Sequence, residues 1–525
     1  MKKLNILFIV LLSMSTIYAQ DISDALRFSQ SEIQGSARYR GLSGAFGALG
    51  GDMSAVSANP AGSAIFIRSH ASITGTSSVL ENNTEYFNTS TNASSSGFDI
   101  NQGGAAFVFV NSNSNSPWRK FTLGVAYDRT SNLDDNWKIN NAVNTNNLVI
   151  VDNNDNELAP VNSIANYFFQ YSENPNIATR LGTVSLNGRS KNQAYEDVFN
   201  EYGFIEQQVF LGFQSEILNE DPNSNDFGTD DNVLYISDVA GGDFVHNYNY
   251  LETGYNGKIS FNLATQYEDN LYIGVNLNSH FIDYQRSVEL SETNNNGGLI
   301  TAIDFDNTLS TTGNGFSFQL GGIMKLTPEF RVGVTYDSPT WYSIEEETTQ
   351  YLDTNRLFDL GENPIGIFSV NVFPTYKLQT PGKVTGSFAY VFAQQGLISF
   401  DYSTKNYSNI KFNPDTDFES LNEGIKNVLT NAATYRLGAE YKHEQFSFRG
   451  GYRFEESPYL DGVTVGDLTG FSLGLGYNFG NTKLDVTYDK WKREDETPLY
   501  TVGLIDTATI NRENANITLS LSFNI

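Results

Sequence analysis

Apolar and polar residues alternate along much of the chain, and the pattern is clearest in the final segment. From Asn516 to Ile525 every second residue is apolar, and the residues between are Asn, Thr or Ser. Since a β-strand directs successive side chains to opposite faces, this segment predicts a strand with one apolar and one polar face. The same period recurs in Phe121–Asp128, Leu271–Asn278, Phe471–Asn478 and Lys483–Asp489.

The alternating segments predict an antiparallel sheet of many strands joined by links that are short and long in turn. A soluble sandwich also alternates, but here the polar face often carries Gly, Asn or opposite charges, as a packed lumen would. Pro381, near the eighth strand, cannot donate to the ladder and predicts a bulge or kink. The pattern therefore favours a β-barrel of 14 strands, with short turns on the periplasmic side and long loops outside. The expected strands are 69–80, 101–111, 119–130, 248–267, 269–290, 309–326, 329–341, 375–393, 397–407, 432–443, 445–455, 468–479, 481–491 and 514–525.

Composition supports a transmembrane barrel. Of the 525 residues, 39% are hydrophobic and 13% aromatic, which is too little apolar content for a bundle of membrane helices and suits alternating strands with aromatic girdles. The net charge of −28 argues against nucleic acid as a partner. The absence of cysteine excludes thiolate catalysis and Cys-based metal sites.

The first residues predict a signal peptide over 1–19. Lys2 and Lys3 form its basic end, Ile6–Leu12 its apolar core, and Ile17–Ala19 a cleavage site. The apolar run is too short for a spanning helix. The protein is therefore expected to be exported and to reside in the outer membrane as a barrel over 69–525, preceded by a segment over 20–68.

The longest connection, 131–247, predicts an extracellular cap inserted in the barrel. It is rich in Asn and Asp, but Val161–Tyr171, Ala194–Tyr202 and Glu206–Leu218 mix apolar and polar residues at helical spacing. Loops of this length are usually functional or disordered. Asp417–Leu429 predicts another short external helix.

Histidine spacing gives no sign of enzymatic chemistry or a metal site. His70, His246, His280 and His443 have no histidine partner at i+3 or i+4, so neither a zinc site nor any other cofactor is expected. No nucleophile elbow and no phosphate-binding glycine loop occurs before a helix. The protein is not expected to be an enzyme.

Two acidic runs begin like calcium-binding loops. Those starting at Asp152 and Asp221 lack Gly at the sixth position and Glu at the twelfth, so solvated loops are favoured over calcium sites. Four charges on polar strand faces are better explained as a structural network than as a polar path, because buried charges must pair. They are Arg449, Arg453, Asp485 and Asp489.

One stretch before the first strand, Ser36–Ser63, does not alternate and is rich in Gly, Ala and Ser. Asp52 is expected to cap a helix over Met53–Ala58, and Pro60 to end it. The run resembles the N-terminal hatch of the FadL/TodX family of outer-membrane transporters for long-chain fatty acids and aromatic hydrocarbons. The resemblance rests on Gly44-Ala45-Phe46, the acidic residue, the short helix and Asn59-Pro60-Ala61, and it suggests a gate formed by Phe46, Asp52, Asn59, Pro60, Ala61 and Gly62.

The resemblance implies a barrel whose N-terminal residues plug the lumen. In that family a hydrophobic ligand enters from outside, binds in the lumen, and leaves after the hatch shifts, in some cases sideways at a kinked strand. Passive uptake of a fatty acid or hydrocarbon-like molecule, with outer-membrane lipid around the barrel, is therefore the leading hypothesis.

Two alternatives stay open. The Asn-rich loops are similar to those of the Bacteroidetes branch of the family, where some relatives carry a haemin-receptor label and others are accessory barrels in protein secretion. The second hypothesis is thus an interaction barrel whose cap binds a protein partner. The third is haemin binding through His70 or His246.

Overall fold

The structure is a computed structural model that describes residues 21–113, 115–152, 154–173, 186–224, 227, 234–366, 369–392 and 395–525. The predicted signal peptide lies outside the described residues, as does much of the predicted loop that follows Asp221.

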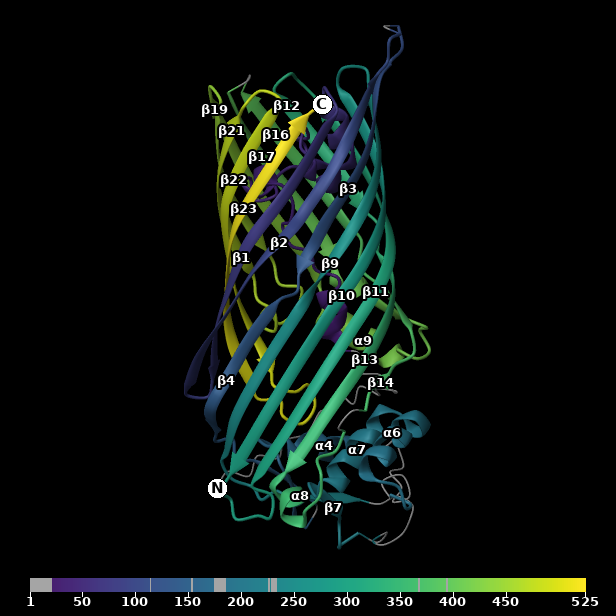
Figure 1. Ribbon diagram of the computed structural model, residues 1–525, viewed down its shortest axis with the longest axis vertical. Helices are drawn as coiled ribbons and strands as arrows, with labels where there is room; N and C mark the ends of the chain where they lie inside the picture. The colour runs from purple at the N-terminus through teal and green to yellow at the C-terminus, as the bar shows by residue number, and fades with distance from the viewer. Residues whose placement is uncertain are drawn as a thin grey trace.

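The fold is a closed antiparallel barrel of 14 strands, which confirms the predicted fold class (Figure 1). The first strand pairs with the last, so the sheet closes on itself. Three wall strands are interrupted, and each is counted once together with its continuation. The wall consists of β1 (His70–Tyr86), β2 (Thr89–Val110), β3 (Trp118–Asn132) with β4 (Asp135–Asn144), β9 (Phe244–Tyr267), β10 (Leu271–Asn294), β11 (Ala302–Lys325), β12 (Phe330–Asp337) with β13 (Trp341–Thr354), β15 (Tyr376–Gln379) with β16 (Lys383–Phe392), β17 (Gly396–Asn406), β19 (Asn431–His443), β20 (Phe446–Glu455), β21 (Leu468–Asn478), β22 (Thr482–Pro498) and β23 (Thr507–Asn524).

The remaining elements lie inside the barrel or at its extracellular end, which is the lower end in Figure 1. The N-terminal segment contains α1 (Ile22–Arg27), α2 (Ala37–Arg40), α3 (Ser54–Ala58) and η1 (Pro60–Ile65). The cap contains β5 (Val149–Val151), β6 (Glu157–Pro160), α4 (Ala165–Ser172), α6 (Lys191–Tyr202), α7 (Phe204–Gln214), β7 (Leu218–Glu220) and β8 (Tyr235–Ser237). Other loops hold α8 (Asn355–Leu360), β14 (Asn371–Val372), η2 (Tyr407–Asn409), β18 (Lys411–Asn413) and α9 (Glu419–Val428).

The helices that the sequence predicted in the cap and after β18 are confirmed by α4, α6, α7 and α9. The kink expected at Pro381 is also present, since β15 ends at Gln379 and β16 starts at Lys383. Within the described part of the chain, no helix is both long and apolar enough to cross a membrane.

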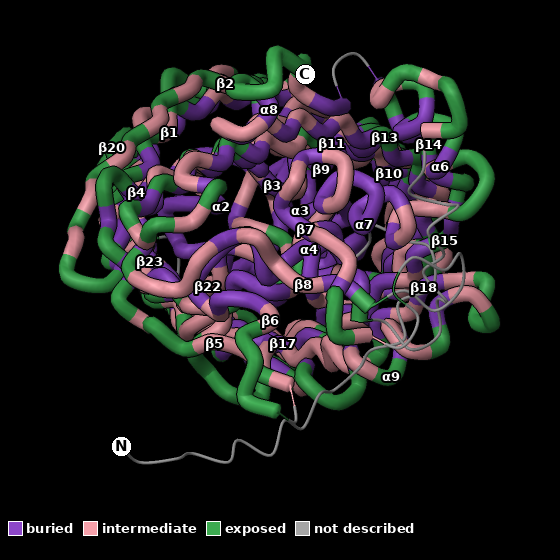
Figure 2. The backbone as a smooth tube through the Cα atoms, turned by 90° about the horizontal axis from the view of Figure 1, so that it is seen from below, coloured by how far each residue is buried: buried purple, intermediate pink, exposed green. Residues whose placement is uncertain are grey.

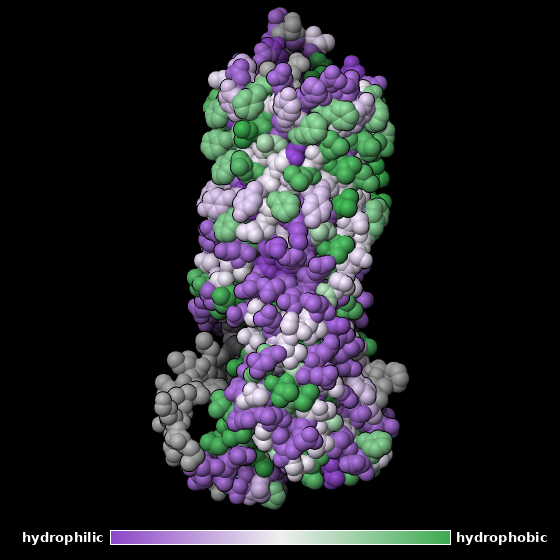
Figure 3. All heavy atoms as spheres, turned by 90° about the vertical axis from the view of Figure 1, so that its left-hand side faces the viewer, coloured by the Kyte–Doolittle hydropathy of each residue, from purple (hydrophilic) through white to green (hydrophobic). Residues whose placement is uncertain are grey.

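The outer surface carries an apolar belt around the periplasmic half of the barrel. On β10, outward positions from Ile273 to Phe281 are mostly apolar, whereas those from Asp283 to Thr293 are all polar. Figure 3 shows the same change, with hydrophobic side chains gathered in the upper half and hydrophilic ones below. The tall strands therefore continue well beyond the membrane.

The wall contains residues that the sequence assigned to the cap. β4 extends through Asn144 and pairs with β9, which begins at Phe244, so the cap is here defined as 145–243. On the extracellular side of the belt, the outward face of the barrel no longer needs apolar residues, because it meets water instead of lipid. The alternation that identifies a membrane strand is lost there.

Candidate functional site

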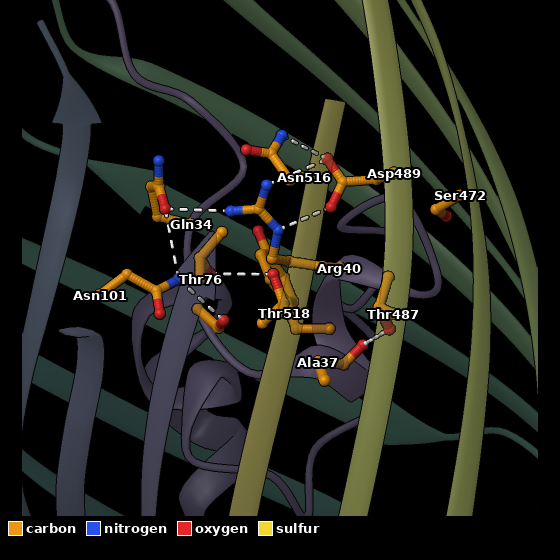
Figure 4. A network of polar contacts seen from close by, with 12 residues as sticks. Gln34, Ala37, Arg40, Thr76, Asn101, Ser472, Thr487, Asp489, Asn516 and Thr518 are labelled. Atoms are coloured by element: carbon orange, nitrogen blue, oxygen red, sulfur yellow. Dashed lines mark hydrogen bonds and ion pairs between the residues drawn. The ribbon is translucent and has the colours of Figure 1, made fainter. Parts of the chain in front are cut away.

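Residues 36–65, here called the hatch, lie inside the barrel toward its periplasmic end, where η1 contacts β9, β10 and β11. Figure 2 labels α2 and α3 within the ring of strands. Helix α2 lies against β21, β22 and β23, and the polar side chains that join it to the wall are drawn in Figure 4. The Arg40 guanidinium binds Asp489 through two parallel contacts of 2.8 and 3.0 Å. Beside it, the Ala37 amide donates to Ser520 Oγ at 2.6 Å. Bidentate pairs of this kind fix orientation as well as position.

A second set of charges joins the hatch to the wall. Glu440 accepts from Arg38 Nε at 2.9 Å and from Arg449 Nε at 2.6 Å, and Arg449 Nη1 reaches Asp485 at 2.7 Å. Arg453 Nη1 pairs with Glu455 Oε1, two positions further along β20, at 3.0 Å. All four lumen charges singled out in the sequence thus belong to ion pairs, and two of them anchor the hatch directly or through Glu440.

Glycines of the wall let the hatch backbone approach closely. A Cβ at Gly321 would lie 2.0 Å from Asn59 Oδ1, and one at Gly274 would lie 2.4 Å from the Pro60 carbonyl carbon. In return, Asn59 Nδ2 donates to the Gly47 carbonyl at 2.8 Å and to the Gly322 carbonyl at 3.2 Å. The Asn-Pro turn therefore packs on a seat formed by Gly274 and Gly321, beside the Asn262 side chain, which donates to the Pro60 carbonyl at 3.0 Å.

This seat gives a testable prediction. Gly321→Leu should displace the Asn59–Pro60 turn, because the new side chain overlaps it, at a cost of roughly 1–3 kcal/mol for the hatch. Ion conductance of the barrel in planar bilayers should rise. Gly322→Leu is the matched control, since a Cβ there meets only ordinary contacts at 3.8 Å. Equal conductance in the two variants would show that the seat does not hold the hatch.

The other candidate gate residues are buried within the hatch. The backbone amides of Phe46 and Gly47 donate to Asp401 Oδ2, each at 2.9 Å. Ala61 packs against the wall, and Gly62 faces α3, where an added Cβ would lie 2.9 Å from that of Ala55.

The start of α3 differs from the prediction. Met53, not Asp52, is the N-cap residue, and the helix starts at Ser54. The Asp52 carboxylate accepts from the Ser54 amide at 2.9 Å but also from Ser36 Oγ at 2.6 Å, so it joins two parts of the hatch. Pro60 opens η1 after α3 has ended at Ala58, as expected.

A cavity of about 920 Å³ lies in the lumen, lined by Tyr167 and Phe204 of the cap and by residues of the segment Asp21–Glu32, which precedes the hatch. Its extracellular part is lined by aromatic side chains, among them Trp137, Tyr167, Tyr248 and Tyr500. Trp137 stacks on Tyr248 with ring centroids 4.9 Å apart. Pockets of this size and aromatic character accommodate small organic ligands.

Two cations of the cavity lining have acidic residues in electrostatic range but no close ion pair among the described residues. Lys405 and Arg436 line the cavity from β17 and β19. Asp401 and Glu455 act on Arg436, and Asp337 acts on Lys405. Among the described residues, no carboxylate lies within 4.0 Å of either side chain, and Arg436 Nε makes no hydrogen bond. Lys405 Nζ donates to the Ser29 carbonyl instead. No sequence motif marks these two residues, because they lie on neighbouring strands, where Lys405 pairs with Ala432 and Arg436 pairs with Asp401.

Helix α1 enters the cavity and is fixed by charge. Arg27 pairs with Asp24 and, at 3.0 Å, with Glu252, and its guanidinium lies 4.4 Å from the centre of the Tyr284 ring. Burial opposes ionisation of Asp24, but Arg27 and Arg286 outweigh it and hold the pKa of that carboxyl below its ordinary value. The helix is thus a charged, fixed part of the cavity wall.

The cap closes the extracellular end. Its helices pack on the strand tips in a large apolar cluster that includes Phe168, Phe210 and Phe305. A buried carboxylate adds a polar contact, because Glu292 accepts from the Ile164 amide at 2.8 Å and faces His246 Nε2 at 3.0 Å. Neither His246 nor His70 lines the cavity.

A seam separates β2 from β4. The β2–β3 ladder ends at Gln102 and Asp128; beyond it, in the described strands, β2 pairs with β1 and β4 pairs with β9. Side chains bridge the seam, with Arg129 bound to Asp99 and Asn82 Nδ2 donating to Asp135 at 2.7 Å. The wall is therefore held there by side chains alone.

The fold and site define a transmembrane β-barrel with a plugged lumen and an internal cavity. The model of the family "Outer membrane protein transport protein (OMPP1/FadL/TodX)" matches residues 238–513, which is more than half of the chain. The chain belongs to this family and is an outer-membrane protein. The model of an uncharacterised family, UPF0164, matches residues 10–117.

Solved structures agree on the fold. A FadL homologue of Pseudomonas aeruginosa has a TM-score of 0.53 at 12% identity, covering 94% of this chain and 99% of that one. The toluene transporter TodX of P. putida has a TM-score of 0.50 at 11% identity, also covering 94% and 99%. None of the curated proteins matches the sequence.

Proposed function

We propose that this protein takes up hydrophobic small molecules across the outer membrane by passive diffusion. The observation that carries the proposal is the cavity of about 920 Å³ in the lumen, inside a barrel of a transport family. The hatch and its gate residues control passage into the periplasm.

Uptake into vesicles with a lipopolysaccharide outer leaflet tests this function. A pyrene-labelled long-chain carboxylic acid should be taken up faster with the protein than without it. Equal rates would overturn the proposal.

The ligand is an amphiphile with an anionic head group, closer to a fatty acid than to a hydrocarbon. Lys405 and Arg436 add positive charge at the hatch end, while aromatic side chains line the cap end. A carboxylate bound beside either cation would receive charge-assisted hydrogen bonds from it. The head group then points toward the hatch and the apolar tail toward the cap.

Substitution of the two cations tests this ligand class. Lys405→Ala with Arg436→Ala should weaken binding of a long-chain carboxylate about tenfold or more, because charged hydrogen bonds are lost. Affinity for the alcohol of equal chain length should change little. Both are measured by calorimetric titration in a neutral detergent, with Lys426→Ala on the exposed face of α9 as control. Equal losses for acid and alcohol would exclude a head-group role.

The seam between β2 and β4 is the proposed sideways exit. It requires only side-chain contacts to break, and exposed Phe98 and Ile100 flank it on the lipid side.

The alternative functions receive less support. Haemin ligation by His70 or His246 conflicts with their positions outside the cavity lining, and the apolar face of the cap is used in packing on the barrel.

A further inference from the structure

The barrel wall differs strongly in height around its circumference. β9, β10 and β11 have 24 residues each, whereas β20 has 10 and β17 and β21 have 11. About 9–11 residues suffice for a tilted strand to cross the membrane. The short strands therefore end where the membrane ends, and the tall ones continue far into the medium. Figure 1 shows α9 partway along the barrel, while α8 and the cap helices lie at its far end.

Two loops follow the short strands, 407–430 and 456–467, and together they are called the low rim. They are joined to each other, because the Leu460 amide donates to the Val428 carbonyl at 2.9 Å. Val428, Leu460 and Val463 are exposed apolar residues of this rim. Tyr435 and Tyr452, on the periplasmic side of the rim, point outward and are exposed as well. They form part of the aromatic girdle at the edge of the apolar belt. The apolar surface of the rim thus continues the membrane-facing surface.

The cavity reaches the protein surface at the same place. Leu421 and Gly424 of α9 and Pro458 and Tyr459 of the second loop line it. Glu456 lines the cavity and is also exposed to solvent. On the tall side the cap packs on the strand tips.

We propose that the low rim rests on the outer-leaflet lipid surface and that the cavity is loaded there, from the membrane. Apolar ligands partition into the lipid, so a mouth at this level meets them at high concentration, whereas the capped end faces water. The loading step rests on the proposed function; the lipid contact does not. Residues of the low rim then act as the contact between membrane and cavity.

The lipid contact is tested by measuring how deeply a label on the low rim lies in the membrane. The chain has no cysteine, so Leu460→Cys gives a single labelling site for a solvatochromic dye. Leu299→Cys, in the loop between the tall strands β10 and β11, is the matched control, because both leucines are 63% exposed. In vesicles containing nitroxide-labelled lipid, emission at position 460 should be blue-shifted and quenched several-fold more than at position 299. Equal quenching would overturn the contact.

Loading is tested with the pyrene-labelled acid placed in the outer leaflet beforehand. Leu460→Glu with Val463→Glu should slow its uptake roughly tenfold, because charged side chains move the rim away from the lipid. Leu299→Glu should leave the rate unchanged. If both variants match the parent, loading at the rim is wrong. If the parent protein itself moves no ligand, the proposed function fails while the quenching result still decides the contact.

Discussion

Deletion of residues 36–62 should convert the barrel into a leaky channel, with single-channel conductance rising about tenfold or more. The deleted segment lies inside the barrel toward its periplasmic end, and a barrel of 14 strands lies between those filled by their own side chains and those with an aqueous channel. The ion path already exists on the other side, because the cavity meets solvent at Glu456. Planar-bilayer recordings of the purified protein measure the change.

The control for this deletion is barrel integrity. Folded barrels with closed ladders keep their compact mobility on unheated gels, and the 14 wall strands do not include the deleted residues. Arg40→Ala, which removes the contact with Asp489 but keeps the chain, should give a smaller increase in conductance. A folded deletion variant that conducts no better than its parent would show that residues 36–62 are not the barrier.

The sequence predicted the strands well where they face lipid and poorly beyond it. β20 and β21 were expected over 445–455 and 468–479 and lie within a residue of those limits, since their outward residues must be apolar throughout. β2 was expected over 101–111 but starts at Thr89. Its extracellular half reads Ser, Thr and Asn on both faces, because one face meets water and the other a polar lumen. Periodicity carries no signal under those conditions.

The candidate site was predicted in part. The hatch was visible because its small residues break the alternation, and its helix and Asn-Pro turn lie in the lumen. The cavity was not visible, because its lining comes from strands and loops distributed over the whole chain. Lys405 and Arg436 illustrate this. They are 31 positions apart in sequence, and both line the cavity because the adjacent strands β17 and β19 direct these side chains into the lumen.

Glu440→Ala should destabilise the protein by about 3–5 kcal/mol, the usual cost of leaving buried charges without their partner. Glu440 is 3% exposed and accepts from two guanidinium groups, that of Arg38 in the hatch and that of Arg449 in the wall. Its loss leaves the two guanidinium groups without the carboxylate that both contact, while Arg449 keeps its ion pair with Asp485. The midpoint of urea unfolding, followed by gel mobility, measures the effect.

The same substitution should also release the hatch. Among the described residues, Arg38 forms an ion pair with Glu440, whereas Arg40 keeps Asp489. The hatch therefore loses one of these two ion pairs with the wall, and conductance should rise. Glu440→Gln retains the shape and one acceptor and should be intermediate in both measurements. Glu423→Ala, on the exposed face of α9, should change stability by less than about 0.5 kcal/mol. If Glu440→Ala unfolds at the same urea concentration as Glu423→Ala and conducts like the parent, the charge network neither stabilises the barrel nor holds the hatch. If Glu440→Ala loses stability but conducts like the parent, the glycine seat beneath Asn59, and not the charge network, keeps the hatch in place.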